Sequence, residues 1–240
     1  MSRRRKQGAI LALAAWSVTL AGCAPSAETT PFADSFAPST TILEQAAQRT
    51  ARLITYRIRS IGCSSMATGS GFAIDEHTIV TNRHVVEDAT RISVSSWDGH
   101  EIQAEMSAVS QERDLAVIKT KSALPGWGTL GQGRVGDDVW VIGFPEGGKI
   151  NVSAGEITAE VDGDALTTDG KTAETATVWQ VSAKVVHGNS GGPLVGPDGN
   201  IVGVVFGYGQ DSGSGYAIQS QGIKSLLQTD VKPVAKTCPL

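Results

Sequence analysis

Short apolar runs alternate with polar turn clusters along most of this chain of 240 residues, from position 52 onward. Runs of this kind, rich in Val, Ile, Thr and aromatic residues and bounded by Gly, Asp, Asn and Ser, are typical of strands in an all-β domain. The chain lacks the long helical periodicity that would connect parallel strands. The pattern therefore predicts an all-β fold.

The predicted strands fall into two groups of six, separated by a segment with Gly and Pro at 124–136. The first group is expected at 53–59, 69–74, 78–81, 91–95, 101–110 and 115–119. The second group is expected at 138–143, 149–158, 176–182, 192–195, 201–208 and 214–218. Short turns between neighbouring runs favour antiparallel pairing. We therefore expect a domain at 46–240 made of two packed six-stranded antiparallel β-barrels, at about 50–130 and 136–228.

Short helices are expected at the two ends of this domain. Thr41 and Glu44 have the spacing of a capping box, in which a hydroxyl and a carboxylate satisfy the first N–H groups of a helix. The first helix is expected to run to about Arg49. A second short helix is expected at 223–227, where it would close the domain.

The N-terminus has the pattern of a secretory signal, predicted at 1–22. Basic residues at 3–6 precede an apolar run of 13 uncharged residues at 8–20, which is too short to span a membrane as a helix. The sequence Leu20-Ala21-Gly22-Cys23 resembles a bacterial lipobox. This resemblance implies cleavage before Cys23 and lipid attachment to its sulfur. Simple signal cleavage near Cys23 is the alternative.

The predicted lipid would hold an exported protein on the cell membrane, facing the periplasm or the extracellular side. Residues 24–38 are rich in Pro, Ser, Thr and Ala, and we expect 23–45 to be a flexible tether between lipid and domain. The formal net charge is −4, but all four charges before Cys23 are basic, which leaves 16 basic and 24 acidic residues and a net charge of −8. A nucleic-acid partner is therefore not expected.

Three cysteines are present, at 23, 63 and 238. If Cys23 carries a lipid, Cys63 and Cys238 are left in a compartment that permits disulfides, and we expect them to pair. Neither has the C-x-x-C neighbour that is typical of a metal site, so no metal or other cofactor is expected.

A loop at 187–194, His-Gly-Asn-Ser-Gly-Gly-Pro-Leu, surrounds Ser190 with three glycines and a proline. Glycines let the backbone adopt positive φ and approach other groups closely, so such a loop can direct two N–H groups to a point beside the hydroxyl. The loop also fits G-x-S-x-G, the nucleophile elbow of α/β-hydrolases. That fold places its catalytic histidine after the serine, whereas the four histidines here, at 77, 84, 100 and 187, all precede Ser190. The elbow interpretation is therefore excluded.

A hydrolytic serine needs a base within hydrogen-bond reach and a third group that orients the base. His84 follows the predicted strand at 78–81 and is the best candidate base. Asp114 opens the apolar run at 115–118, where a carboxylate is well placed to bind an imidazole N–H. His84, Asp114 and Ser190 occur in the order His, Asp, Ser, which is that of chymotrypsin-like proteases.

Four sequence blocks resemble trypsin-like, chymotrypsin-fold serine proteases of the HtrA and MarP type. They are 69–74 (GSGFAI), 81–86 (TNRHVV), 113–118 (RDLAVI) and 188–194 (GNSGGPL), and 214–218 (SGYAI) adds a further match. The resemblance covers about 58–227 and implies a two-barrel serine endopeptidase with its site between the barrels. It implies that Ser190 is the nucleophile, His84 the base and Asp114 its orienting group, and that the N–H groups of Gly188 and Ser190 form the oxyanion hole.

Departures from the family pattern refine these expectations. No PDZ domain is expected after 227, and Asn189 replaces the Asp that pairs with a newly cut N-terminus in digestive proteases. Activation by that ion pair is therefore not expected. A catalytically idle protease fold, used as a binding or scaffold lipoprotein, is the main alternative function; it would usually have lost a triad residue or a loop glycine.

In this family the stretch before the serine and a strand near 204–207 line the primary substrate pocket. Neither contains an acidic residue, which excludes a trypsin-like preference for Arg or Lys. Val185, Val186 and Phe206 therefore predict a pocket for a small or apolar side chain in a protein or peptide substrate. The alternatives are that Lys184 faces an acidic side chain or that it is simply solvated.

Overall fold

In the computed structural model the residues described are 45, 49–50, 52–110, 112–163, 177–209, 213–228 and 232–234. The predicted signal peptide and tether, Cys23 and Cys238 lie outside these residues. Of the helix expected at 41–49, the described residues are helical, and helical conformation continues through 52–54. The first strand therefore begins at Thr55, two residues later than expected.

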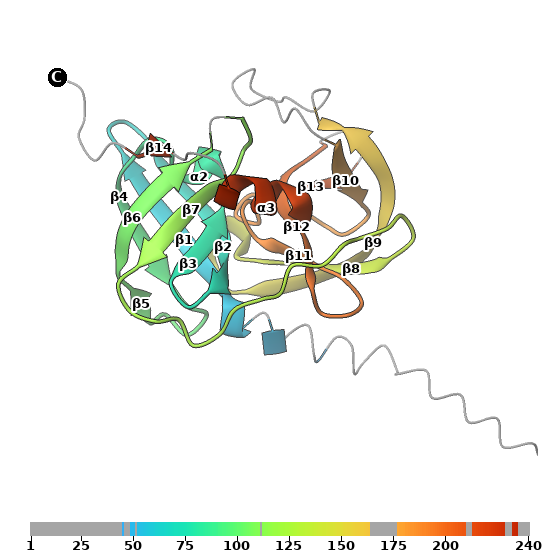
Figure 1. The fold of residues 1–240 in the computed structure, drawn as a ribbon, viewed down its shortest axis with the longest axis horizontal. Helices are drawn as coiled ribbons and strands as arrows, with labels where there is room; N and C mark the ends of the chain where they lie inside the picture. The colour runs from blue at the N-terminus through green and yellow to red at the C-terminus, as the bar shows by residue number, and fades with distance from the viewer. Residues whose placement is uncertain are drawn as a thin grey trace, which may run out of the picture. The chain divides into compact units, whose positions relative to one another are not determined.

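The first half of the chain forms an eight-stranded, curled sheet, on the left of Figure 1. Its order is β14-β6-β7-β3-β2-β1-β4-β5. The strands are β1 Thr55–Gly62, β2 Met66–Asp75, β3 Thr78–Thr81, β4 Ala89–Ser95, β5 Glu101–Ile102, β6 Ala104–Val109, β7 Ala116–Thr120 and β14 Lys232–Pro233. The prediction of a six-stranded barrel here was wrong in two respects. The run at 101–110 is divided at Gln103, and β14 adds a strand from the far end of the chain by pairing with β6.

The second half forms a closed six-stranded barrel, which confirms the expectation for this half (Figure 1). Its order is β10-β13-β12-β11-β8-β9. The strands are β8 Asp138–Gly143, β9 Asn151–Asp162, β10 Thr177–Val181, β11 Pro193–Val195, β12 Ile201–Tyr208 and β13 Gly215–Gln219. The all-β, chymotrypsin-like architecture is thus as predicted.

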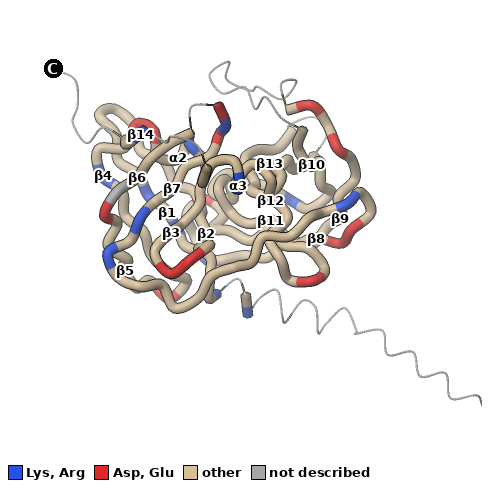
Figure 2. Tube along the Cα trace, viewed as in Figure 1, with Lys and Arg blue, Asp and Glu red and all other residues tan. Residues whose placement is uncertain are grey.

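Three short helical segments complete the described structure. They are α2 Arg83–Val86, the 3₁₀ turn η1 Pro145–Gly147 between β8 and β9, and α3 Ser220–Gln228, which begins three residues before the helix expected at 223–227. None of the described helices is long and apolar enough to cross a membrane. Acidic and basic residues are interspersed along both sheets in Figure 2, so the acidic surplus is spread over the surface.

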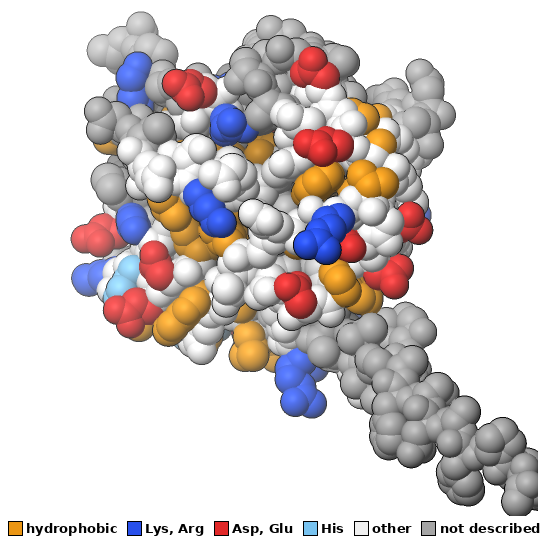
Figure 3. All heavy atoms as spheres, turned by 45° about the vertical axis from the view of Figure 1, so that its right-hand side comes forward, with side chains coloured by type: hydrophobic (Ala, Val, Ile, Leu, Met, Phe, Trp, Pro, Cys, Tyr) orange, Lys and Arg blue, Asp and Glu red, His pale blue; other side chains and the backbone are white. Residues whose placement is uncertain are grey.

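Four apolar clusters are found among the described residues, and a small one around Trp140, Ile142 and Val195 lies within the barrel strands β8 and β11. The other three are larger. One fills the first sheet and one fills the barrel. The third joins them: Phe72, Val80 and Leu115 of the first half pack with Val204 and Ile218 of the barrel and with α3. On the face drawn in Figure 3, hydrophobic side chains appear only in small, separate groups among polar ones. The main apolar contact between the two halves is therefore internal, and it fixes how they face each other.

Replacing Ile218 with Ala is expected to lower the free energy of unfolding by about 2–5 kcal/mol, because the side chain is fully buried in the cluster that joins the two sheets. Replacing Ile61 with Ala removes the same atoms from a residue that is 45% exposed and is expected to cost less than about 1 kcal/mol. Urea unfolding followed by circular dichroism measures both. Equal losses in the two variants would contradict the assigned role of this cluster.

Candidate active site

Two adjacent strands bring His84 and Asp114 together. β3 ends at Thr81 and β7 begins at Ala116, and these two residues are partners in the antiparallel ladder. Residues just after β3 and just before β7 must therefore lie side by side, although they are about thirty positions apart in sequence. Asn82, which is fully buried, fixes this junction by donating from Nδ2 to the Asp114 carbonyl at 2.7 Å.

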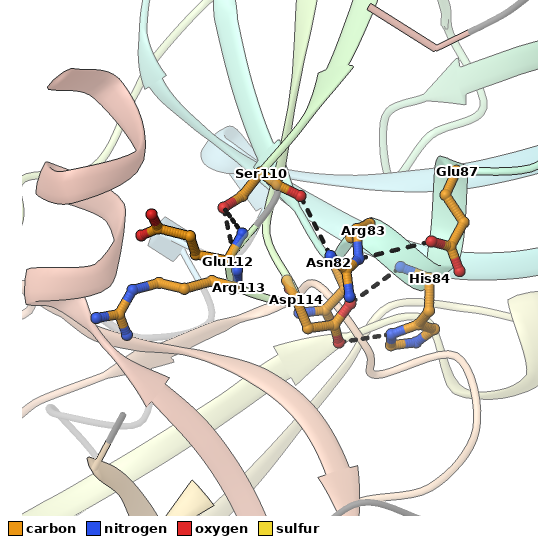
Figure 4. A network of polar contacts seen from close by, with 8 residues as sticks. All are labelled: Asn82, Arg83, His84, Glu87, Ser110, Glu112, Arg113 and Asp114. Carbon is orange, nitrogen blue, oxygen red and sulfur yellow. Dashed lines mark hydrogen bonds and ion pairs between the residues drawn. The ribbon is translucent and has the colours of Figure 1, made fainter. Parts of the chain in front are cut away.

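The Asp114 carboxylate binds His84 through both of its oxygens. Oδ2 lies 2.7 Å from His84 Nδ1, and Oδ1 accepts the His84 backbone N–H at 3.0 Å (Figure 4). Asp114 is only 4% exposed. A carboxylate only accepts hydrogen bonds, so this contact favours the imidazole tautomer that has its proton on Nδ1. The pair is thus arranged as a base with an orienting carboxylate.

A second set of contacts supports the segment that leads into Asp114. Ser110 Oγ accepts the backbone N–H groups of Glu112 and Arg113, and the Ser110 carbonyl accepts from Arg83 Nη1 at 3.3 Å. Arg83 also forms an ion pair with Glu87, which lies four residues later and is the C-cap of α2. The side chains of Glu112 and Arg113 point away from the His84–Asp114 pair (Figure 4). Arg83 therefore ties the helix that carries His84 to the turn before Asp114.

Ser190 comes from the other half of the molecule, in the turn before β11. Its carbonyl accepts the backbone N–H of Ser70 in β2 at 2.7 Å, so the first sheet contacts the loop that carries Ser190 directly. The next residue, Gly191, donates to Val205 in β12 at 2.7 Å. In this structure Ser190 Oγ donates to the carbonyl of Phe206 at 3.4 Å, a long and therefore weak hydrogen bond.

In the oxyanion loop, residues 187–190, three carbonyls accept hydrogen bonds from residues outside the loop. The His187 carbonyl accepts from Glu146 N at 2.7 Å, and the Gly188 carbonyl accepts from Ser70 Oγ at 2.6 Å. The Asn189 carbonyl accepts from Gly192 N at 2.9 Å. In a planar trans peptide the carbonyl and the following N–H point in opposite directions. The N–H groups of Gly188 and Ser190 therefore point the other way, and within the described part of the chain neither donates to an acceptor.

Local backbone geometry makes this loop possible. Gly188 has φ +90°, which is accessible to glycine and costly for other residues. Asn189 is buried, and its Oδ1 accepts Val186 N while its own N–H donates to the Val186 carbonyl. A neutral side chain thus ties the loop to itself at the position where digestive proteases have their charged partner.

Of the residues predicted to line the substrate pocket, Val185 is 7% exposed and packs in the barrel core with Val181 and Ala217. Val186 is half-buried and takes part in the loop through its backbone. Phe206 is half-buried and packs against the cluster between the sheets, with its ring 6.4 Å from that of Tyr216.

Three residues that hold the oxyanion loop were missed by the sequence reasoning: Ser70, Phe144 and Glu146. In the sequence, Ser70 lies between two glycines and Glu146 follows Pro145. Neither position by itself indicates a contact with the oxyanion loop. Glu146 has φ +52°, the one positive value among the described residues other than glycine. Arg57 Nη1 donates hydrogen bonds to the carbonyls of Gly147 and Gly148 in the same turn. The pKa of the Arg57 guanidinium is lowered, mainly by burial and to a smaller extent by the nearby charge of Arg59.

Cys63, just after β1, is disulfide-bonded. Both other cysteines of the chain lie outside the described residues, so its pairing with Cys238 stays a prediction. The described residues contain no cluster of three or more His, Cys, Asp or Glu that could hold a metal ion.

Comparison with known proteins identifies the family. The family model for the trypsin-like peptidase domain matches residues 69–204, more than half of the chain. This chain belongs to the trypsin-like peptidase family. The match begins at the strand that contains Ser70 and includes all three candidate catalytic residues.

The relatives are HtrA-type proteases. A probable periplasmic serine endoprotease, DegP-like, of Chlamydia muridarum is 36% identical over 167 residues, which cover 66% of this chain and 33% of that protein. The serine protease Do-like HtrA of Bacillus subtilis is 33% identical over 166 residues, covering 66% of this chain and 35% of that protein. The chain thus spans about a third of the length of the curated relatives it matches.

Solved structures are similar over a larger share. The Rv3671c protease of M. tuberculosis in its active form superimposes with a TM-score of 0.70 and 25% identity, covering 85% of this chain and 90% of that one. The HtrA-type protease AlgW with a tripeptide gives a TM-score of 0.67 and 30% identity, covering 77% and 62%.

Replacing Gly188 with Ala is expected to disrupt the oxyanion loop, because a Cβ there would lie 2.3 Å from the Phe144 carbonyl and 2.6 Å from Glu146 N. Gly99 is the matched control, with φ +87° and open space around its Cβ position. We expect Gly99→Ala to cost about 1–2 kcal/mol of stability from backbone strain alone. Gly188→Ala should cost about 1–3 kcal/mol more from overpacking. Urea unfolding compares them, and equal losses would contradict the close packing of this loop.

Proposed function

We propose that this chain is a serine endopeptidase that cleaves proteins or peptides in the cell envelope through His84, Asp114 and Ser190. The observation that carries the proposal is the oxyanion loop, whose N–H groups at 188 and 190 have no acceptor among the described residues, while the carbonyls of the same two peptide groups are held by Glu146 N and Gly192 N. The His84–Asp114 bond at 2.7 Å supplies the oriented base that such a serine needs.

The proposed reaction passes through one covalent intermediate, an ester between Ser190 Oγ and the acyl part of the substrate. The Ser190 hydroxyl turns from the Phe206 carbonyl toward His84, and Oγ attacks the carbonyl carbon of the scissile peptide while Nε2 takes its proton. Asp114 stabilises the imidazolium that forms. The N–H groups of Gly188 and Ser190 bind the oxyanion. Collapse breaks the C–N bond, His84 gives its proton to the leaving amine, and water then hydrolyses the acyl-enzyme by the same steps.

The finer parts of the proposal rest on sequence and on the relatives. Export to the envelope is supported by the signal pattern and by relatives that are described as periplasmic. Anchoring through a lipid on Cys23 is supported by the lipobox, and a Cys63–Cys238 disulfide by the bonded state of Cys63. A substrate that is a polypeptide is supported by the tripeptide bound to AlgW.

Preference for a small or apolar side chain is proposed for the primary pocket. Support comes from Val186 and Phe206, which are apolar and half-buried. Val185 packs in the barrel core and gives no support for a place in the pocket. Among the described residues, the stretch at 184–190 and β12 contain no acidic group that would bind Arg or Lys. A cleavage profile on a peptide library is expected to show Ala, Val or similar residues before the cut bond, and a dominant Arg would contradict this.

Replacing Ser190 with Ala is expected to abolish covalent labelling by a fluorophosphonate probe and to lower hydrolysis of fluorescent casein by about 10⁴-fold or more. His84→Ala should give a similar loss, because the hydroxyl then lacks its base. Ser122→Ala and His100→Ala change exposed residues of the same types and are expected to keep full activity. Labelling that persists in Ser190→Ala would refute the assignment, and an unlabelled but folded wild-type chain would favour the scaffold alternative.

Replacing Cys23 with Ser is expected to move the protein from the membrane fraction to the soluble exported fraction, because the sulfur that would carry the lipid is lost. Fractionation of cells with an antibody against the protein measures this, and labelling with an alkyne-tagged fatty acid shows the lipid itself. Fatty-acid labelling unchanged in Cys23→Ser would contradict the anchor.

A further inference from the structure

Ser70 makes four hydrogen bonds at the junction of the two sheets. Its backbone N–H donates to the Ser190 carbonyl at 2.7 Å, and its own carbonyl accepts from Thr81 Oγ1 at 2.7 Å. Its hydroxyl donates to the Gly188 carbonyl at 2.6 Å and accepts the backbone N–H of Phe144 at 2.9 Å. The residue is fully buried, so water does not compete for these bonds.

We propose that Ser70 is a positioning residue, whose hydroxyl fixes the Gly188–Asn189 peptide and thereby the backbone angles of Gly188, the residue whose own N–H is expected to bind the oxyanion. The inference rests on the proposed function, because the loop matters for rate only if Ser190 is the nucleophile. Ser70 acts through the loop and does not touch the reacting atoms.

The hydroxyl suits this place because it both donates and accepts. The Gly188 carbonyl needs a donor, and the Phe144 N–H needs an acceptor; both residues are buried. A hydroxyl meets both needs with one atom. The neighbouring positions are closed to side chains: a Cβ at Gly69 would lie 2.7 Å from Val85, and one at Gly71 would lie 2.6 Å from Ile58. Of residues 69–71 in strand β2, Ser70 is thus the only one that offers a side chain to the oxyanion loop.

The backbone of the oxyanion loop can adopt an alternative conformation because residue 188 is a glycine. Glycine populates positive and negative φ about equally, so the peptide groups on either side of it can rotate when their carbonyls are released. Without the Ser70 hydroxyl, the Gly188 carbonyl has no donor on the side of the first sheet. Rotation of the Gly188–Asn189 peptide changes the backbone angles of Gly188, so the Gly188 N–H can leave the direction in which it would bind the oxyanion.

The test compares Ser70→Ala with Ser220→Ala. Ser220 is a matched control, because it is 4% exposed and its hydroxyl likewise donates to one backbone carbonyl, that of Gly131 at 2.5 Å, in a part of the molecule that does not contact the oxyanion loop. The measured quantity is the second-order rate constant for modification of the folded protein by a fluorophosphonate, well below the melting temperature. We expect it to fall about 100-fold in Ser70→Ala, as for loss of one oxyanion donor, and to stay within twofold of the wild type in Ser220→Ala.

Hydrogen–deuterium exchange supplies a readout that does not depend on catalysis. The Asn189 amide, which donates to the Val186 carbonyl, is expected to exchange faster in Ser70→Ala, while amides in the barrel core keep their protection. If Ser70→Ala does not fold, Ser70→Cys carries both measurements, since the thiol is a weaker donor of similar size, and about a tenfold fall is expected.

A modification rate within twofold of the wild type, or unchanged exchange at Asn189, in a folded Ser70 variant would overturn the proposal. An equal fall in Ser220→Ala would also overturn it, because the effect would then be one of general stability. Failure of the wild-type chain to react with the probe would instead count against the proposed function, and the exchange measurement would still decide whether Ser70 holds the loop.

Discussion

The apolar cluster between the two sheets is the constraint on which the site depends. Phe72, Val80 and Leu115 meet Val204 and Ile218 there, and β2, β3 and β12, which position the site, all contribute to it. The polar contacts that cross between the halves, such as Ser70 to Ser190, are short and directional. Hydrogen bonds of this kind tolerate only small displacements, so they form only if the nonpolar packing has already set the distance between the sheets.

The two parts of the site depend on this packing to different degrees. The His84–Asp114 pair is assembled within the first sheet, by the ladder of β3 and β7 and by Asn82. The oxyanion loop belongs to the barrel, but three of its contacts come from elsewhere: two from Ser70 in the first sheet and one from the η1 turn. Contacts within the first sheet therefore suffice to place His84 beside Asp114. The directions of the Gly188 and Ser190 N–H groups depend in addition on the contacts between the two sheets.

The fold class could be predicted from sequence because it depends on local patterns, and the proximity of His84 and Asp114 agrees with the expected order of residues. Apolar alternation indicated the strands, and the order His84, Asp114, Ser190 with its glycine loop indicated the chemistry. Residues 52–54 are helical although their composition suits a strand, because the helix before them continues. The strand β14 escaped prediction because two residues have no pattern and pair with β6 only in three dimensions.

The supports of the oxyanion loop could not be predicted for a similar reason. Ser70 lies about 120 positions before Gly188, and nothing in its neighbourhood shows which carbonyl its hydroxyl will meet. Glu146 contributes through its backbone, which carries no signature of residue type. The direction of Val185 follows from the turn that Asn189 imposes and from space in the barrel core, neither of which is visible in a linear pattern.

The positive φ of Glu146 limits which residues this position can hold. An L-residue held at +52° is tolerated there because its N–H anchors the His187 carbonyl and its neighbours are braced by Arg57. The side chain makes no part of that contact, but the backbone angle still favours Gly, Asn or Asp at 146 over β-branched residues. The turn between β8 and β9 therefore limits the choice of residue at this position through backbone conformation and not through side-chain chemistry.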